Sequence, residues 1–293
     1  MRAGAPYTIR NAGTPTGDRM AVAKARQLSY DTCVAVVSTA GREDKTVAEP
    51  LIRRLRLQAR AWSRRHPRFH ACVRLLKHGP YRGFTDERAR DSLLREARTA
   101  NWRVLYLGSG GRRQSGMVNL DVTWETGPDV VGDGFRLPFA DATFDAIFCE
   151  SVIEHVPDPE AFLSAAGRAL KPGGYWYLEV PFLQPFHGGT DFQRWTIAGF
   201  HRTLLRVGLA PLASGLHMGP GFMVMWMLRE WLALALSGGN APLRSVWHWL
   251  WGFGLSPLLL TDLLLMRLPG AADLACAHYH IARRPLGDAI DPL

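Results

Sequence analysis

Five short apolar segments, separated by glycine, proline and aspartate, constrain the fold of this chain more than any other feature. They comprise residues 102–107, 117–122, 129–133, 145–150 and 175–180. All five are rich in β-branched or aromatic side chains, which is typical of strands buried on both faces of a parallel sheet.

Helical patterns alternate with these segments. Residues 160–170 place apolar side chains at helical spacing and are followed by Lys-Pro-Gly-Gly, a common helix stop, and a second helix is expected over 196–207. Strands that alternate with helices predict an α/β fold with a Rossmann-like, doubly wound sheet. Such sheets bind their ligands beyond the carboxyl ends of the strands.

Charge is concentrated in one part of the chain. Of the 35 Lys and Arg among the 293 residues, ten lie between 51 and 82, a segment without Asp or Glu, and the remainder is close to neutral despite the net charge of +9. The four cysteines are widely scattered and form no Cys-x-x-Cys pair, which argues against a zinc ribbon and favours a reducing compartment.

Apolar residues are concentrated in a second segment, 217–270, which holds five of the ten tryptophans. Its longest uncharged stretch, 245–261, is interrupted by glycine and proline, and it is shorter than the roughly 20 apolar residues of a spanning helix. Helices rich in Trp beside a basic segment suit a surface lying in a membrane interface. A helical subdomain or homodimer interface explains the pattern equally well.

These observations divide the chain into four parts: a flexible tail (1–48), a basic helical extension (49–98), an α/β core (99–216 and 271–285) and the Trp-rich apolar insertion (217–270). The first 50 residues contain no apolar run of signal-peptide length. We therefore expect a cytoplasmic protein, with peripheral attachment to the inner face of the membrane as the alternative that the two appendages suggest.

A glycine-rich turn, Gly108 to Gly111, follows the first predicted strand. Such a turn allows a ligand to approach the backbone closely. The dinucleotide-binding fingerprint needs a glycine where this chain has Arg113, and an acid roughly 20 residues after the turn begins. The next strand instead ends at Asp121, only 13 positions after Gly108, which argues against a nicotinamide enzyme.

Six motifs follow one another in the order found in a known family. They are VLYLGSGG (104–111), NLDV (119–122), GDGFRLPF (132–139), FDAIFCESVIEHVPDP (144–159), ALKPGGYWYLEVPF (169–182) and FHGGTDFQRWT (186–196). The set resembles the class I S-adenosylmethionine-dependent methyltransferases, in particular a bacterial, methyltransferase type 11-like subgroup with LPF and EHV motifs. The resemblance implies a seven-stranded, mostly parallel sheet with an antiparallel last strand, which we place at the edge, over 274–284.

The resemblance also implies where S-adenosyl-L-methionine would bind. The glycine turn would bring backbone amides to the methionine end, Asp121 would accept hydrogen bonds from both ribose hydroxyls, and Asp133 would lie near the adenine amino group. Other positions would flank the ring or line the cleft floor. The expected cofactor-binding residues are Gly108, Ser109, Gly110, Asp121, Asp133, Gly134, Phe135, Glu150 and Ser151.

Two positions depart from the family pattern. Tyr106 stands where an acid usually orients the methionine amino group, and Arg112 stands where a third glycine is usual. The methionine end could therefore be held differently, through its carboxylate, by Arg112 or Arg113.

The residues expected to act on the acceptor follow the fourth and fifth strands. A base is needed only when the acceptor must lose a proton, and the candidates are His155, His187 and Asp191. Arg194 and Trp195 could bind an acidic or sugar-like acceptor, although Arg194 could equally pair with a neighbouring carboxylate.

We predict no metal at the EHV motif. Some related quinone-biosynthesis O-methyltransferases are thought to bind a divalent metal through Glu-x-x-Glu-His, and here the first of those positions is Ser151. Glu150 is one residue out of register, which on a helix turns a side chain by roughly 100°.

The leading hypothesis is therefore a methyltransferase with a small-molecule, glycan-like or lipid-linked acceptor. The alternative is a non-catalytic protein, membrane-associated or acting in complex assembly, that retains the fold. Nucleic acid is not an expected partner, because a charge run is usually a solvated or lipid-facing surface and no nucleic-acid-binding module is recognisable.

Overall fold

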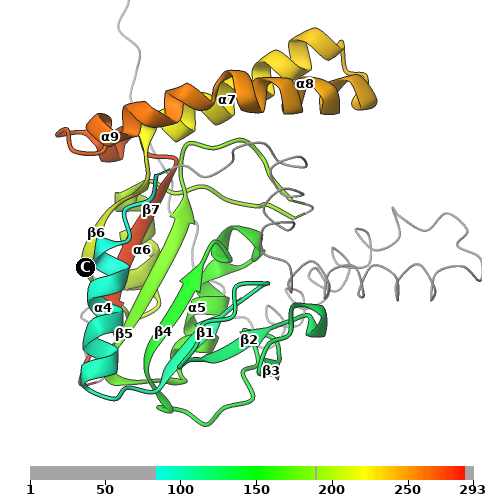
Figure 1. The fold of residues 1–293 in the computed structure, drawn as a ribbon. Coiled ribbons are helices and arrows are strands. Elements are labelled where there is room, and N and C mark those ends of the chain that lie inside the picture. Colours follow the sequence, from blue (N-terminus) through cyan, green and yellow to red (C-terminus); the bar gives the residue numbers. More distant parts are fainter. Residues whose placement is uncertain (1–83, 189, 288–293) are drawn as a thin grey trace, which may run out of the picture. The chain divides into compact units, whose positions relative to one another are not determined.

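The computed structural model describes residues 84–188 and 190–287 (Figure 1). The predicted flexible tail and the basic segment at 51–82 lie outside the described residues. The structure therefore describes the predicted core and the predicted apolar insertion but only part of the N-terminal half, and the expected domain division stays a prediction.

Seven strands form one sheet in the order β3-β2-β1-β4-β5-β7-β6. Strands β1 to β5 pair in parallel, and β7 is antiparallel to both of its neighbours. The predicted seven-stranded, mostly parallel sheet with an antiparallel last strand is therefore confirmed. The strands are β1 Val104–Leu107, β2 Val118–Asp121, β3 Val130–Val131, β4 Phe144–Glu150, β5 Leu170–Pro181, β6 Ala210–Met218 and β7 Ala277–Arg283.

The predicted position of the last strand was wrong. Strand β7 lies inside the sheet between β5 and β6, and β6 forms the edge. The β6 sequence APLASGLHM is mostly half-exposed and contains proline, glycine and small residues, so it lacks the apolar run of a strand buried on both faces.

Helices cover both faces of the sheet (Figure 1). Leu105 and Leu107 of β1 belong to a core shared with α5 (Pro159–Gly167) and α6 (Ile197–Arg206). The alternate β1 residues pack with α4 (Arg88–Thr99) on the other face. The expected helices were confirmed, although the first is shorter because Leu170 already begins β5.

Two longer helices, α7 (Pro220–Ser237) and α8 (Ala241–Gly254), stand between β6 and β7. They pack against each other, and Glu230 of α7 lies 3.1 Å from Arg244 and 2.8 Å from His248 of α8. Shorter helices follow at Ser256–Thr261 (η3), Asp262–Leu265 (α9) and Ala271–Leu274 (η4), and two further single turns are Trp124–Thr126 (η1) and Ile153–His155 (η2). In the described ranges, no helix combines the length and apolar character needed to cross a bilayer.

One buried carboxylate fixes the start of α7. Asp262 accepts hydrogen bonds from the backbone N–H groups of Gly221 at 2.7 Å and Phe222 at 2.9 Å. A Cβ added at Gly219 or Gly221 would lie 2.4 Å from side-chain atoms of Asp262 or Thr261, so both glycines are required for this close approach. The negative charge also suits the positive end of the helix dipole.

The Asp262→Ala substitution should lower the free energy of unfolding by about 2 kcal/mol, because two N–H groups at a buried helix start lose their acceptor. Asp262→Asn, which keeps one acceptor oxygen, should lose about half as much. Urea unfolding of both variants measures the effect, with the exposed Asp273→Ala as the matched control. Equal stability of Asp262→Ala and the control would contradict this role.

Candidate functional site

The glycine turn leaves the carboxyl end of β1 with positive φ angles of 72° at Gly108 and 50° at Gly110. A Cβ at Gly108 would lie 2.4 Å from Val152, so glycine is required there for packing as well. The amides of Gly108 and Ser109 both donate to the carbonyl of Leu120, at 2.9 and 3.0 Å. This differs from the expectation that the amides turn toward a ligand: the turn is fastened to β2 instead.

Asp121 ends β2 and connects the same two strands. Its Oδ2 accepts the Gly110 amide at 2.7 Å, and its Oδ1 accepts the amide and hydroxyl of Thr123 at 2.9 and 3.0 Å. The side chain is buried, yet Oδ2 accepts only this one bond from the described chain. A carboxylate oxygen can accept two, so Oδ2 retains capacity for a ligand hydroxyl.

The residues expected around adenine lie in one tight turn. The exposed Asp133 accepts the amide of Phe135 at 2.9 Å, and the ring of Phe135 packs edge-on against Phe162 with centroids 5.4 Å apart. A Cβ at Gly134 would lie 2.2 Å from the Phe162 ring. The turn is therefore shaped by packing against α5.

Tyr106 and Glu150 form a hydrogen-bonded pair across β1 and β4. The Tyr106 hydroxyl donates to Glu150 Oε2 at 2.7 Å, and Arg90 of α4 donates to the other oxygen at 2.5 Å. Tyr106 stands where the family usually has an acid, and it is bonded to the carboxylate of Glu150 on the neighbouring strand. Ser151, the next residue, is exposed and has a φ of 54°.

The two arginines after the turn are distinguished by their partners. Arg113 forms an ion pair with Asp129 and donates to the carbonyl of Gly127 at 3.3 Å, so it is held beside β3. The exposed Arg112 lies close enough to Tyr106 to influence the pKa of its hydroxyl. Arg113 is thus already paired with a carboxylate, and which of the two arginines would hold the cofactor stays a prediction.

Strand β5 carries a further buried acid, Glu179, whose pKa is influenced by the charge of Glu150. Glu179 accepts a hydrogen bond from Tyr177 at 3.0 Å and lies 3.3 Å from the imidazole of His217. Burial, reinforced by the charge of Glu150, raises the pKa of Glu179 to about 8. The carboxyl group therefore keeps its proton to a higher pH than an ordinary glutamate does.

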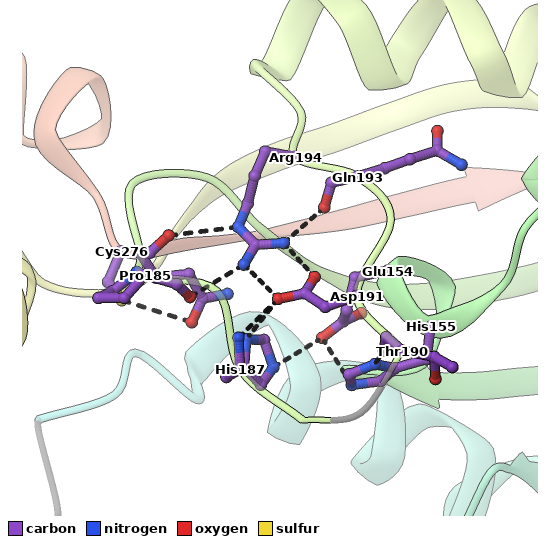
Figure 2. Close-up of polar contacts among 10 residues, drawn as sticks. Glu154, His155, Pro185, His187, Thr190, Asp191, Gln193, Arg194 and Cys276 are labelled. Atoms are coloured by element: carbon purple, nitrogen blue, oxygen red, sulfur yellow. Dashed lines mark hydrogen bonds and ion pairs between the residues drawn. The ribbon is translucent and has the colours of Figure 1, made fainter. Parts of the chain in front are cut away.

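A second polar cluster gathers after β4 and β5 (Figure 2). Glu154 Oε1 lies 3.9 Å from Nε2 of His155 and 3.8 Å from Nε2 of His187, and the Glu154 side chain is 1% exposed. Burial raises the pKa of Glu154 and lowers that of His187. The fold thus brings both predicted histidines together around an acid that the sequence analysis did not select.

Asp191 and Arg194 fix the segment that carries His187. Asp191 accepts the amide of His187 at 2.8 Å, and its Oδ2 lies 3.2 Å from His187 Nδ1. Burial opposes ionisation of Asp191, but its bonds to Arg194 and His187 prevail and lower its pKa to about 2.

Arg194 uses all five of its N–H groups inside the chain. They donate to both oxygens of Asp191 and to the carbonyls of Gln184, Pro185 and Gln193. The guanidinium has no sixth donor. Arg194 thus pairs with a carboxylate, as in the alternative from the sequence, and its contact with an acceptor stays a prediction.

Trp195 is placed differently from its prediction. Its side chain is 8% exposed and packs against Phe200 in the core, with ring centroids 5.4 Å apart. Burial of this kind indicates packing rather than contact with an acceptor.

The described residues offer two places for a bound group. Beside the glycine turn, the Ser109 hydroxyl is buried without a hydrogen-bond partner among the described residues, and Asp121 has acceptor capacity left. These groups fit the two ribose hydroxyls and the polar methionine end of the S-adenosylmethionine expected from the sequence. The Glu154, His155 and His187 group supplies ligand atoms that all lie within 4.8 Å of one another.

Comparison with known proteins supports the same chemistry. The methyltransferase domain family matches residues 113–178. A 38-residue segment is 53% identical to the ubiquinone biosynthesis O-methyltransferase of Xanthomonas oryzae pv. oryzae, and a 39-residue segment is 58% identical to that of Xylella fastidiosa. Each match covers 13% of this chain and 16% of the relative, so the chain spans only a small part of these proteins.

Solved structures with a similar fold include a Burkholderia thailandensis 1,6-didemethyltoxoflavin-N1-methyltransferase with bound S-adenosylhomocysteine. It is 12% identical, with 83% of this chain and 93% of that chain covered and a TM-score of 0.40. An S-adenosylmethionine-dependent methyltransferase from Mesorhizobium loti is 16% identical, with 62% and 91% covered and a TM-score of 0.38.

Glu179 makes stability depend on pH. Its pKa rises from an ordinary 4.5 to about 8 on folding, so the folded state holds an extra proton between these values. The free energy of unfolding should therefore fall as pH rises through this window, by about 5 kcal/mol in total from this group. Urea unfolding between pH 5 and 9 should show this loss in the wild type and a flatter profile in Glu179→Gln. Parallel profiles would contradict the assignment.

Proposed function

We propose that the chain is a class I S-adenosylmethionine-dependent methyltransferase and that it methylates a small-molecule acceptor at the membrane surface. The observation that carries the cofactor half of the proposal is the bond between the Gly110 amide and Asp121. This bond joins the glycine turn to the end of β2. The backbone that would contact the methionine end and the carboxylate that would bind the ribose hydroxyls therefore lie side by side.

The methionine end would be held by residues that differ from the family pattern. Arg112 would pair with the cofactor carboxylate, because Arg113 is already bound to Asp129. Glu150 is held by Tyr106 and Arg90, and it would accept a hydrogen bond from the cofactor amino group. It would thus replace the acid that the family usually has at the position of Tyr106. Asp133, Gly134 and Phe135 would border the adenine.

When bound, S-adenosylmethionine supplies a methyl group on a positively charged sulfur, whose C–S bond breaks as the acceptor atom attacks. The protein then has to align the acceptor and take up any proton that it loses. The Glu154, His155 and His187 cluster is the candidate for the second task, since its two imidazoles are about one third exposed while its carboxylate is buried.

The expected class of acceptor follows from the surface of α7, α8, η3 and α9. Residues 220–268 contain 14 of the 24 exposed large hydrophobic side chains found in the described chain, including Trp231, Trp249 and Phe253. So dense an apolar surface on a monomer marks an interaction site. A lipid-linked acceptor would be met there.

A bilayer suits this surface better than a second copy of the chain. Exposed Trp and Phe side chains favour the headgroup region, and two cations accompany them, the half-exposed Arg244 on α8 and the exposed Arg267 just after α9. The basic segment at 51–82 adds sequence charge of the sign that anionic lipid attracts.

S-adenosylmethionine should bind the purified full-length chain, and Asp121→Ala should weaken binding at least tenfold, about 1.4 kcal/mol, by removing the ribose acceptor. Isothermal titration calorimetry provides the measurement. The exposed Asp141→Ala is the matched control and should bind like the wild type. Wild-type protein that binds no cofactor would favour the non-catalytic alternative.

The chain should float with vesicles containing anionic phosphatidylglycerol, and less with phosphatidylcholine alone. Trp231→Ser combined with Leu264→Ser should reduce flotation at least fivefold, because each loses apolar area available for burial. Leu212→Ser on β6, which is similarly exposed, is the control. Unchanged flotation, or self-association abolished by the double variant, would reject the bilayer.

A further inference from the structure

We propose that Glu154, His155 and His187 form a binding site for a divalent transition-metal ion. They supply two imidazole nitrogens and one carboxylate oxygen, a donor set suited to zinc and to its first-row neighbours. The family motif with two glutamates is absent because Ser151 occupies its first position. The third ligand comes instead from a segment 32 residues after His155.

The distances between the three ligand atoms are somewhat longer than those of a bound metal site. Nε2 of each histidine lies 3.8 or 3.9 Å from the same oxygen, Glu154 Oε1. Ligand atoms at the corners of a tetrahedral zinc site are about 3.4 Å apart, as follows from metal–ligand bonds of about 2.1 Å. All three ligand atoms lie within 4.8 Å of one another, so on binding a metal they would draw together by up to about 1.4 Å.

The second ring nitrogen of each histidine, Nδ1, lies close to an oxygen atom. His155 Nδ1 contacts the carbonyl of Thr190, and His187 Nδ1 lies 3.2 Å from Asp191, whose position Arg194 fixes (Figure 2). At His155, the Thr190 carbonyl keeps the proton on Nδ1 and leaves the lone pair of Nε2 for a metal, whereas His187 Nδ1 is close to Asp191 but makes no hydrogen bond within the described residues. Such supporting acceptors are typical of histidine metal ligands.

The burial of Glu154 points independently to a cation. Its side chain is 1% exposed, and neither carboxylate oxygen has a hydrogen-bond partner among the described residues. A buried polar group without a partner is costly, and a bound cation would remove the cost. The imidazoles are 32% and 29% exposed, so an ion can reach them and keep positions open for another ligand.

The role of the metal, unlike its binding, rests on the proposed function. An acceptor oxygen at an open position would lose its proton more readily, as water does on zinc. His155 and His187 would then act as ligands rather than as the free base considered from the sequence, and Asp191 would position His187.

Zinc binding to the full-length, metal-stripped chain tests the site. Calorimetry with ZnCl2 and elemental analysis after dialysis should give one ion per chain, with MgCl2 at least a hundredfold weaker because hard cations prefer all-oxygen sites. Glu154→Gln and His187→Ala should each weaken zinc binding at least tenfold. His201→Ala, on α6 and outside the cluster, is the matched control.

Absence of stoichiometric zinc, equal affinity in the cluster variants and the control, or a preference for magnesium would overturn the proposal. Circular dichroism shows whether each variant is folded, and the near-isosteric Glu154→Gln keeps the test valid if His187→Ala is not. S-adenosylmethionine binding is measured on the same samples. Zinc binding without cofactor binding would reject the proposed function alone, and cofactor binding without zinc would reject the metal site alone.

Discussion

The parallel pairing of β1 with β2 on one side and β4 on the other is the constraint on which the rest of the site depends. The register sets Leu107 beside Leu120 and Tyr106 beside Phe148, so the next residues along each strand meet at one edge. The Gly110–Asp121 and Tyr106–Glu150 bonds both cross from β1 at this edge. A shift of β2 or of β4 by one residue would reverse the side chains of that strand and break its own contact with the β1 side.

A buried ion pair plays the corresponding part in the second cluster. Asp191 and Arg194 close the segment between Gln184 and Trp195 upon itself, and that closure presents His187 to Glu154. Ion pairs of this kind are sensitive to the loss of one partner, because the other charge is left buried and uncompensated. The contacts beside the glycine turn thus depend on sheet register, and the cluster of Glu154, His155 and His187 depends on one arginine.

Sequence reasoning reached the features that are local or periodic. Buried strands show as apolar runs, and Asp121 was correctly placed at the end of the second strand because it closes such a run. Strand β6 was missed since its half-exposed residues have no such run, and β7 was consequently placed at the edge. The partners of Arg194 and the meeting of Glu154 with His187 depend on the path of a loop, which residue type and spacing do not encode.

Helix α7 connects the exposed apolar surface to the cluster of Glu154, His155 and His187. The ring of Trp226 lies 5.8 Å from that of His187 and packs edge-on against Phe222, whose amide is held by Asp262. Met227 and Trp231, further along the same helix, are exposed. A displacement of α7 on a bilayer would therefore press on the segment that carries His187. Binding of lipid and of an ion at Glu154, His155 and His187 should for this reason influence each other, since a coupling between two sites is necessarily reciprocal.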